Sequence, residues 1–125
     1  MKNGYPDVAD VLSMYFDGLY HSDTKRLSNV FHPHAHYVCA TDGTLTHRTM
    51  EDYFRVVDQR PSPASCGEAR ADSIVSIEFA GPVTAFARVN CAIGSKYFTD
   101  LLTLIHIDGR WQIISKVFHF DIRES

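Results

Sequence analysis

The chain has 125 residues, of which 45% are hydrophobic and 22% are charged, with a formal net charge of −3. This length and composition are typical of one globular domain spanning residues 1–125. Basic residues are scattered and fewer than acidic ones, which argues against a nucleic acid or an anionic membrane as partner. No stretch is long and apolar enough for a membrane span or a signal peptide, and the three cysteines are widely spaced. These features predict a cytoplasmic protein without a disulfide framework or a structural zinc site.

The first half of the chain predicts three helices and one strand. Asp7 is a candidate N-cap for the first helix, and Thr49 for the third. The short second helix should end at Pro33, because proline cannot continue a helix. A short strand is expected over residues 35–41. The apolar positions that recur at helical spacing are Val8, Val11, Leu12, Tyr15 and Leu19, then Leu27, Val30 and Phe31, then Met50, Tyr53, Phe54 and Val57.

The second half of the chain predicts only strands. They are expected at about residues 73–80, 83–93, 97–107 and 110–120, and are separated by Gly81-Pro82, Gly94-Ser95 and Asp108-Gly109. Helices that precede strands in one short chain favour an α+β fold, with the helices packed on one face of a curved antiparallel sheet.

The last two strands predict a long hairpin, because Asp108-Gly109 suits a two-residue type I′ turn. Pairing Ile107 with Arg110 then assigns each side chain to one face. The outer face carries Lys116 and several exposed Phe and Ile residues, and is a candidate interface for a homodimer. The helix-facing side would hold Phe98, Asp100, Leu102, Leu104, His106, Trp111, Ile113, Ser115, Val117 and His119.

Asp100 and His119 are the main catalytic candidates. In this register they are diagonal neighbours on adjacent strands. A carboxylate that orients an imidazole fixes its tautomer and raises its basicity, as proton transfer requires. A buried structural pair is the alternative interpretation, because buried charges are normally paired in any case.

Five further residues are candidates for lining a ligand pocket: Tyr15, His36, Tyr53, Trp111 and Ser115. The two tyrosines interrupt apolar helix stripes with a hydroxyl group that could face a ligand. His36 and the nearby His34 also allow a metal interpretation, but no acid or cysteine stands at ligand spacing, so no metal site is predicted. The chain has no phosphate-binding loop or dinucleotide motif, and no cofactor is predicted.

Three stretches carry a resemblance to a known superfamily: Phe31-His32-Pro33, Phe98-Thr99-Asp100, and Asp108-Gly109-Arg110-Trp111 running on to Lys116-Val117-Phe118-His119. With the order of elements, they resemble the nuclear transport factor 2-like superfamily, and within it the small bacterial proteins named putative lumazine-binding. The resemblance extends from about Val8 to His119. It implies a cystatin-like cone, in which three helices pack in the concave face of a strongly curved antiparallel or mixed sheet. Such cones are usually dimeric through the sheet.

Three functions remain open at this point, because one fold hosts many activities. The first is binding of a flat apolar or heteroaromatic small molecule between helices and sheet. The second is a cofactor-independent isomerase, dehydratase or cyclase that uses Asp100 and His119 as an acid/base pair. The third is a dimeric interaction protein whose pocket is vestigial.

Overall fold

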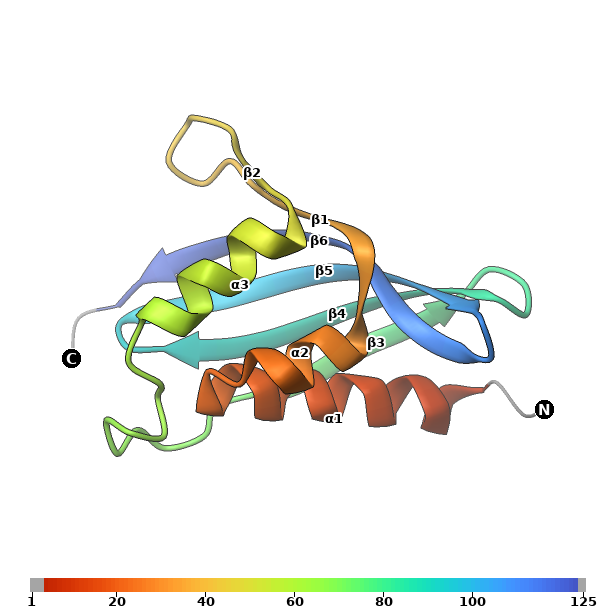
Figure 1. Ribbon diagram of the computed structural model, residues 1–125, viewed down its shortest axis with the longest axis horizontal. Coiled ribbons are helices and arrows are strands. Elements are labelled where there is room, and N and C mark those ends of the chain that lie inside the picture. The colour runs from red at the N-terminus through yellow and green to blue at the C-terminus, as the bar shows by residue number, and fades with distance from the viewer. Residues whose placement is uncertain (1–3, 124–125) are drawn as a thin grey trace.

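The computed structural model describes residues 4–123, which form three helices and six strands (Figure 1). Two strands precede the third helix, and four strands follow it. The elements in chain order are α1 (Tyr5–His21), α2 (Thr24–Val30), β1 (Phe31–Cys39), β2 (Thr46–Arg48), α3 (Met50–Gln59), β3 (Ser73–Phe79), β4 (Thr84–Ile93), β5 (Lys96–Ile107) and β6 (Arg110–Ile122).

The helices are fixed by local signals at their ends. The Asp23 side chain accepts hydrogen bonds from the Lys25 and Arg26 amides at the start of α2, and Thr49 accepts from the Asp52 amide at the start of α3. Thr49 was predicted as a cap and is confirmed. The prediction that Asp7 is the N-cap of α1 was wrong, because the N-cap is Gly4 and Asp7 lies in the first turn of the helix.

The second helix is shorter than the sequence predicted. It ends at Val30, and β1 already begins at Phe31, two residues before Pro33. The aromatic Phe31 is extended and almost fully buried. The strand β2 has three residues and was not predicted, since so short a run carries no period that a sequence could display.

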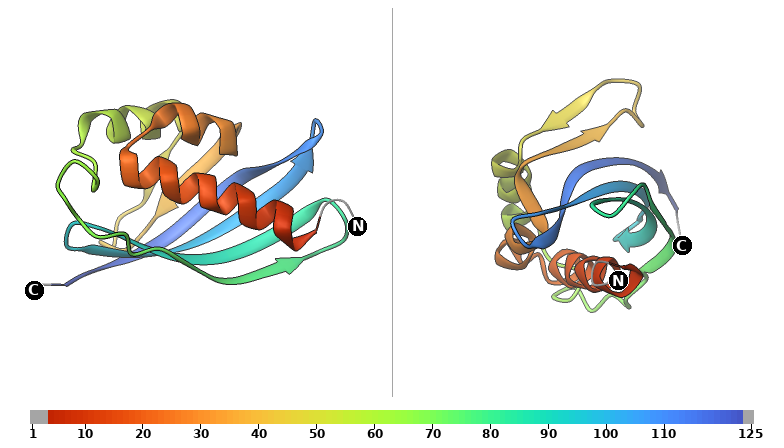
Figure 2. Two further views of the ribbon diagram at one scale, coloured as in Figure 1. Left: turned by 90° about the horizontal axis from the view of Figure 1, so that it is seen from below. Right: turned by 90° about the vertical axis from the view of Figure 1, so that its right-hand side faces the viewer.

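The strands form one mixed sheet in the order β2-β1-β6-β5-β4-β3, in which only the β1–β6 pair is parallel. The sheet curls around the helices, which all lie on its concave side (Figure 2). The predicted α+β cone is therefore confirmed. No helix within residues 4–123 is long and apolar enough to cross a membrane.

The β5–β6 hairpin turns as predicted. Asp108 and Gly109 have φ angles of 55° and 80°, and Ile107 pairs with Arg110. Positive φ at both central residues is the requirement of the type I′ turn. The Gly94-Ser95 turn is confirmed too, because Ile93 pairs with Lys96.

The hairpin register changes partway along β6. Leu104 pairs with Ile113, but Thr103 pairs with Ser115, so Ile114 is an extra residue that forms a β-bulge. Beyond a bulge the alternation of side chains is inverted. The strand therefore buries Lys116 and Phe118, while Ser115, Val117 and His119 point outward, and the predictions for these residues were wrong.

The small side chains on the inner face of β4 let the helices lie close to the sheet. Its buried side chains are small or medium in size: Ala85, Ala87, Val89 and Cys91. Above them α1 and α2 touch closely, since a Cβ built on Gly18 would lie 2.7 Å from Leu27 Cδ2 and 2.8 Å from its Cγ. The core is thus packed to the point where one methyl group matters.

Candidate functional site

A cluster of four polar side chains lies in the middle of this core. Asp100 is 0% exposed and Lys116 5% exposed, and Tyr15 and Tyr53 are also fully buried. The Tyr15 hydroxyl donates a hydrogen bond to Asp100 Oδ2 at 2.5 Å, and Lys116 Nζ lies 4.0 Å from the same oxygen. Lys116 Nζ also donates to the Tyr53 hydroxyl at 3.3 Å. We call these four residues the buried centre.

Each member of the buried centre comes from a different element. Tyr15 belongs to the apolar stripe of α1, and Tyr53 to the buried face of α3. Asp100 is on β5, directly opposite Phe118 of β6. Lys116 reaches the interior only because the bulge at Ile114 inverts the alternation of β6.

The Lys116 ammonium group is enclosed by aromatic rings. Its Nζ lies between 5.0 and 5.5 Å from the centroids of Tyr15, Tyr37, Tyr53 and Phe118. Ring faces attract a cation, and the attraction is stronger away from water. Together with Asp100, the rings offset part of the cost of burying the charge.

Two groups of the buried centre, Lys116 and Tyr15, have raised pKa values. Burial alone would lower the pKa of Lys116, but the neighbouring Asp100 carboxylate, helped by Tyr53, outweighs it and leaves that pKa above its usual value. Burial, reinforced by Asp100, raises the pKa of Tyr15. At neutral pH Lys116 is therefore an ammonium ion and Tyr15 a neutral phenol.

One atom of the buried centre has hydrogen-bonding capacity to spare. Asp100 Oδ1 is buried and has no partner among the described residues. A cavity of about 20 Å³ adjoins Lys116, enough for about one water molecule. Its walls are Leu19, Tyr37, Tyr53, Arg60, Cys91, Ile93, Phe98 and Lys116. Because Arg60 follows α3 and Ile93 ends β4, this cavity lies at the end of the cone where α3 stops (Figure 1).

The predicted Asp100–His119 pair does not form. His119 pairs with Thr99, the neighbour of Asp100, so it lies on the opposite face of the sheet. Its side chain is 58% exposed, and its ring nitrogens lie 3.0 Å from Thr41 Oγ1 and 3.0 Å from Asp121 Oδ1. The sequence register failed here because it assumed unbroken alternation along β6.

Two predicted pocket residues also lie outside the cone. Ser115 follows the bulge on the outer face and pairs with His36 of β1. His36 is exposed, with its Nδ1 3.0 Å from His47 Nε2. Within residues 4–123, no group of three or more His, Cys, Asp or Glu side chains could hold a metal ion.

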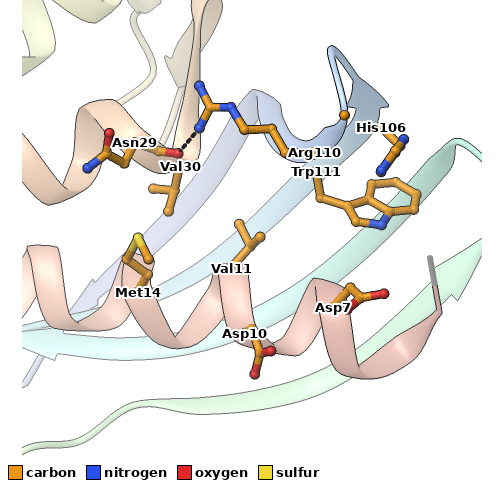
Figure 3. A pocket seen from close by; sticks show the side chains of 10 residues that line it. Asp7, Asp10, Val11, Met14, Asn29, Val30, His106, Arg110 and Trp111 are labelled. Carbon is orange, nitrogen blue, oxygen red and sulfur yellow. Dashed lines mark hydrogen bonds between the residues drawn. The ribbon is translucent and has the colours of Figure 1, made fainter. Parts of the chain in front are cut away.

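Trp111 lines a different cavity (Figure 3). The tip of the β5–β6 hairpin, which carries Trp111, lies at the opposite end of the cone from the last turn of α3 (Figure 1). This cleft has a volume of about 550 Å³ and lies between the first turns of α1, the end of α2 and the tip of the β5–β6 hairpin. It shares no lining residue with the cavity beside Lys116; its walls are Asp7, Asp10, Val11, Met14, Asn29, Val30, His106, Gly109, Arg110 and Trp111.

Lys116 is the residue of the buried centre that the sequence prediction missed. Strict alternation in β6 would bury His119 and expose Phe118, which is an unfavourable exchange for a core. The preference of Phe118 for the interior, beside two consecutive isoleucines at 113 and 114, was the available signal of a change in phase.

The comparisons with known proteins agree with this fold. The sequence model of the family described as "Putative lumazine-binding" matches residues 5–119. A curated relative, "Aldolase FrzH" from Cladobotryum sp, is 28% identical over 117 residues, covering 92% of this chain and 90% of that protein.

Solved structures give the same result. A nuclear transport factor 2-like protein of unknown function from Shewanella baltica has a TM-score of 0.85 and 26% identity, covering 95% of this chain and 94% of its own. Another from Methylobacillus flagellatus has a TM-score of 0.79 and 24% identity, covering 93% and 90%. The chain therefore belongs to the putative lumazine-binding family and has the nuclear transport factor 2-like fold.

Proposed function

We propose that the protein is a cofactor-independent enzyme that binds a small carbonyl compound in the cone and moves a proton at the carbon next to the carbonyl group. The observation that carries this proposal is the buried centre itself. A buried ion pair rarely adds net stability compared with apolar residues of similar size. A carboxylate, an ammonium group and two phenols gathered in one core therefore suggest a chemical role.

The chemistry assigned to each group follows from its position in the buried centre. Asp100, through its unpartnered Oδ1, would take the proton when the C–H bond breaks. The bonding electron pair then moves onto the carbonyl oxygen and forms an enolate. Lys116 as an ammonium ion and Tyr53 as a phenol would stabilise this negative oxygen, since fixed charges act strongly where water is excluded. Where the enolate carries an adjacent hydroxyl group or double bond, return of the proton from Asp100 to the other carbon gives an isomer. Attack of the enolate carbon on a second carbonyl forms a carbon–carbon bond and an alkoxide, and return of the proton from Asp100 to that alkoxide gives an aldol.

The relative named as an aldolase supports this class of reaction, because aldol chemistry also passes through an enolate or an equivalent of one. The raised pKa of Lys116 argues against a covalent route. Attack of lysine on a carbonyl requires a neutral amine. We therefore assign Lys116 an electrostatic role.

We propose that a substrate reaches the buried centre by way of the small cavity that Arg60 and Ile93 border, because Tyr53 and Lys116 line its inner walls. The cavity beside Lys116 has a volume of about 20 Å³, so a molecule larger than water must displace side chains there. Small ketones are consequently the appropriate first probes.

Exchange of ketone hydrogens for deuterium tests the proposal. Hydroxyacetone in D₂O, followed by proton NMR, should lose its α-hydrogen signals faster with protein than without. Asp100→Asn should abolish the acceleration, and Tyr53→Phe should reduce it by about 100-fold or more, as expected for one lost oxyanion donor. His119→Asn is the control, because His119 lies outside the cone, and it should exchange like the wild type.

Two results would contradict the catalytic role. The first is that hydroxyacetone, acetone and pyruvate all exchange no faster with the protein than in buffer. The catalytic proposal would then fail, and ligand binding would be the remaining function for the cone. Exchange equally fast in a folded Asp100→Asn variant would remove the buried centre from the reaction. Reduction with borohydride in the presence of hydroxyacetone should leave Lys116 unmodified by mass spectrometry, and a trapped adduct would replace the electrostatic role with a covalent one.

We further propose that the protein forms a homodimer through the outer face of its sheet. Leu101 and Val117 are cross-strand neighbours on that face and are 36% and 44% exposed. Phe86 lies on the same face and is also exposed. Apolar side chains grouped on a strand surface favour burial against a second copy. Sedimentation velocity should give a mass near twice 14.1 kDa.

A further inference from the structure

Three cations gather around Tyr37 of β1. The pKa of Tyr37 is raised by burial, and the charges of Lys116, Arg48 and Arg60 each act against that rise. Lys116 Nζ lies 5.5 Å and Arg48 Cζ 5.8 Å from the centroid of the Tyr37 ring. Arg60 borders the same cavity of about 20 Å³ as Tyr37 and Lys116. We call Lys116, Arg48 and Arg60 the basic corner.

The two arginines of the basic corner have no counter-charge in the described chain. Lys116 has one, because its Nζ lies 4.0 Å from Asp100 Oδ2. Within residues 4–123, no carboxylate oxygen lies within 4.0 Å of the guanidinium of Arg48 or Arg60. Both side chains are nevertheless half-buried. A cation that is partly removed from water without a counter-charge is costly, so the corner is suited to hold an anion.

The backbone of Arg60 is fixed by its neighbours. The helix α3 ends at Gln59, and Arg60 is its C-cap, with an extended conformation of φ −101° and ψ 145°. Pro61 favours this conformation, because a proline restricts the residue before it to the extended region. The Arg60 amide also donates to the Val57 carbonyl at 3.3 Å. The guanidinium therefore extends from an ordered backbone, which lowers the entropic cost of holding a ligand.

The size of the shared cavity limits how far apart two bound groups can be. Arg60 and Lys116 both line a space of about 20 Å³, which holds about one water molecule. A carboxylate bound by Arg60 and a carbonyl oxygen bound by Lys116 must therefore be close together in one molecule. In a 2-oxo acid the carboxylate carbon is bonded directly to the carbonyl carbon, whereas a 3-oxo acid separates the two by a further carbon.

We propose that the substrate of the buried centre is a 2-oxo acid, whose carboxylate binds Arg60 while its keto oxygen faces Lys116. This inference rests on the proposed function for the reacting atoms and adds the anion site. A guanidinium can donate two parallel hydrogen bonds to one carboxylate. The proton of carbon 3 goes to Asp100, the C–H electron pair forms the carbon–carbon double bond, and the carbonyl π pair moves onto the keto oxygen. Arg48 contributes positive potential to the same corner.

Oxamate tests the anion site without any reaction. It has the shape and charge of pyruvate, but an amide nitrogen replaces the methyl group, so it has no carbon-bound hydrogen to lose. Titration calorimetry should show one oxamate bound per chain. Arg60→Gln should weaken binding at least about tenfold, as expected for the loss of a charge-assisted hydrogen bond. The matched control is Arg55→Gln, because Arg55 lies on the same helix but is 65% exposed and pairs with Glu51, and its affinity should match the wild type.

Deuterium exchange of pyruvate tests the substrate class. For each compound the acceleration is the exchange rate with protein divided by the rate in buffer, at equal concentrations. Pyruvate should be accelerated at least about tenfold more than hydroxyacetone, because only pyruvate carries a charge for Arg60. This comparison uses the wild-type protein and so does not depend on the folding of any variant. In Arg60→Gln the preference for pyruvate should fall by about the same factor.

The anion site and the proton transfer can fail separately. No binding of oxamate, or equal affinity in a folded Arg60→Gln variant, would overturn the anion site. Exchange of hydroxyacetone without any preference for pyruvate would also overturn it, while leaving the proton transfer in place. Oxamate binding that depends on Arg60, with no exchange of any ketone, would support the anion site and overturn the proton transfer, so that 2-oxo acids would be ligands and not substrates.

Discussion

Removing Lys116 gives the sharpest test of the buried centre. Lys116→Met keeps a long, flexible side chain but deletes the ammonium group. The partner Asp100 is fully buried and would then keep only the hydrogen bond from Tyr15. We expect the variant to be strongly destabilised, because it leaves a buried carboxylate without its counter-charge.

The magnitude follows from the geometry. Lys116 Nζ and Asp100 Oδ2 are 4.0 Å apart. Two unit charges at that distance attract by about 4 kcal/mol at the effective dielectric constant of about 20 that describes protein sites. Breaking a buried pair from one side costs about 3–5 kcal/mol in other proteins. We therefore expect Lys116→Met to lower the free energy of unfolding by about 3 kcal/mol or more.

The assay is a double-mutant cycle by urea denaturation. It compares wild type, Lys116→Met, Asp100→Asn and the double variant, in which the neutral Asn can still accept from Tyr15. The double variant should recover about 2–4 kcal/mol relative to the sum of the single changes, because neither charge is then stranded.

The reasoning fails if the destabilisation of the double variant equals the sum of the two single changes within about 0.5 kcal/mol, because independent sites add to within that margin. It also fails if Lys116→Met is as stable as the wild type. Either result would mean that the two charges are not a coupled buried pair. A stable double variant without ketone exchange would show that the centre is kept for chemistry at a cost in stability.

Three other predictions concern pH, packing and assembly. Burial raises the pKa of Cys91 from 9.0 to about 12, and the pKa of Lys116 is also raised, so the native state keeps protons that the unfolded chain loses. The free energy of unfolding should keep its full value below pH 9 and should fall between pH 9 and 12, and the fall should be less steep in Cys91→Ala. Urea denaturation that gave a higher free energy of unfolding at about pH 10 than below about pH 9 would contradict this. Gly18→Ala should lower the free energy of unfolding by about 1–2 kcal/mol in the same assay, because the added Cβ collides with the buried Leu27. The higher helix propensity of alanine offsets only part of this cost. A variant as stable as the wild type would disprove the close approach. Val117→Lys should halve the sedimenting mass without unfolding the monomer, and an unchanged dimer would place the interface elsewhere.

Much of the fold could be predicted from local patterns. The cap at Thr49 and the turns at Gly94-Ser95 and Asp108-Gly109 depend on residues that are neighbours in sequence. So does the alternation of β4, which buries Ala87 and Val89. The prediction that Asp100 faces the helices was correct for the same reason, because β5 has no bulge between the turn and that residue.

The candidate site could be predicted only in part. Tyr15, Tyr53 and Asp100 meet in the interior, but their cationic partner is Lys116, which was assigned to the outer face, and His119 lies outside the cone. A bulge of one residue makes this difference. Its position depends on which side chains of β6 fit against the helices, and those contacts join residues far apart in the chain.

The sequence by itself determined the order of elements, the turn types and the faces of the regular strands, because those properties depend on short-range sterics and periodicity. Only the tertiary structure decided which residues form the polar centre and where the open cleft lies. The phase of β6 beyond Ile114 is set by packing. In that phase the core encloses Phe118 and surrounds Lys116 with aromatic rings, while His119 stays in water.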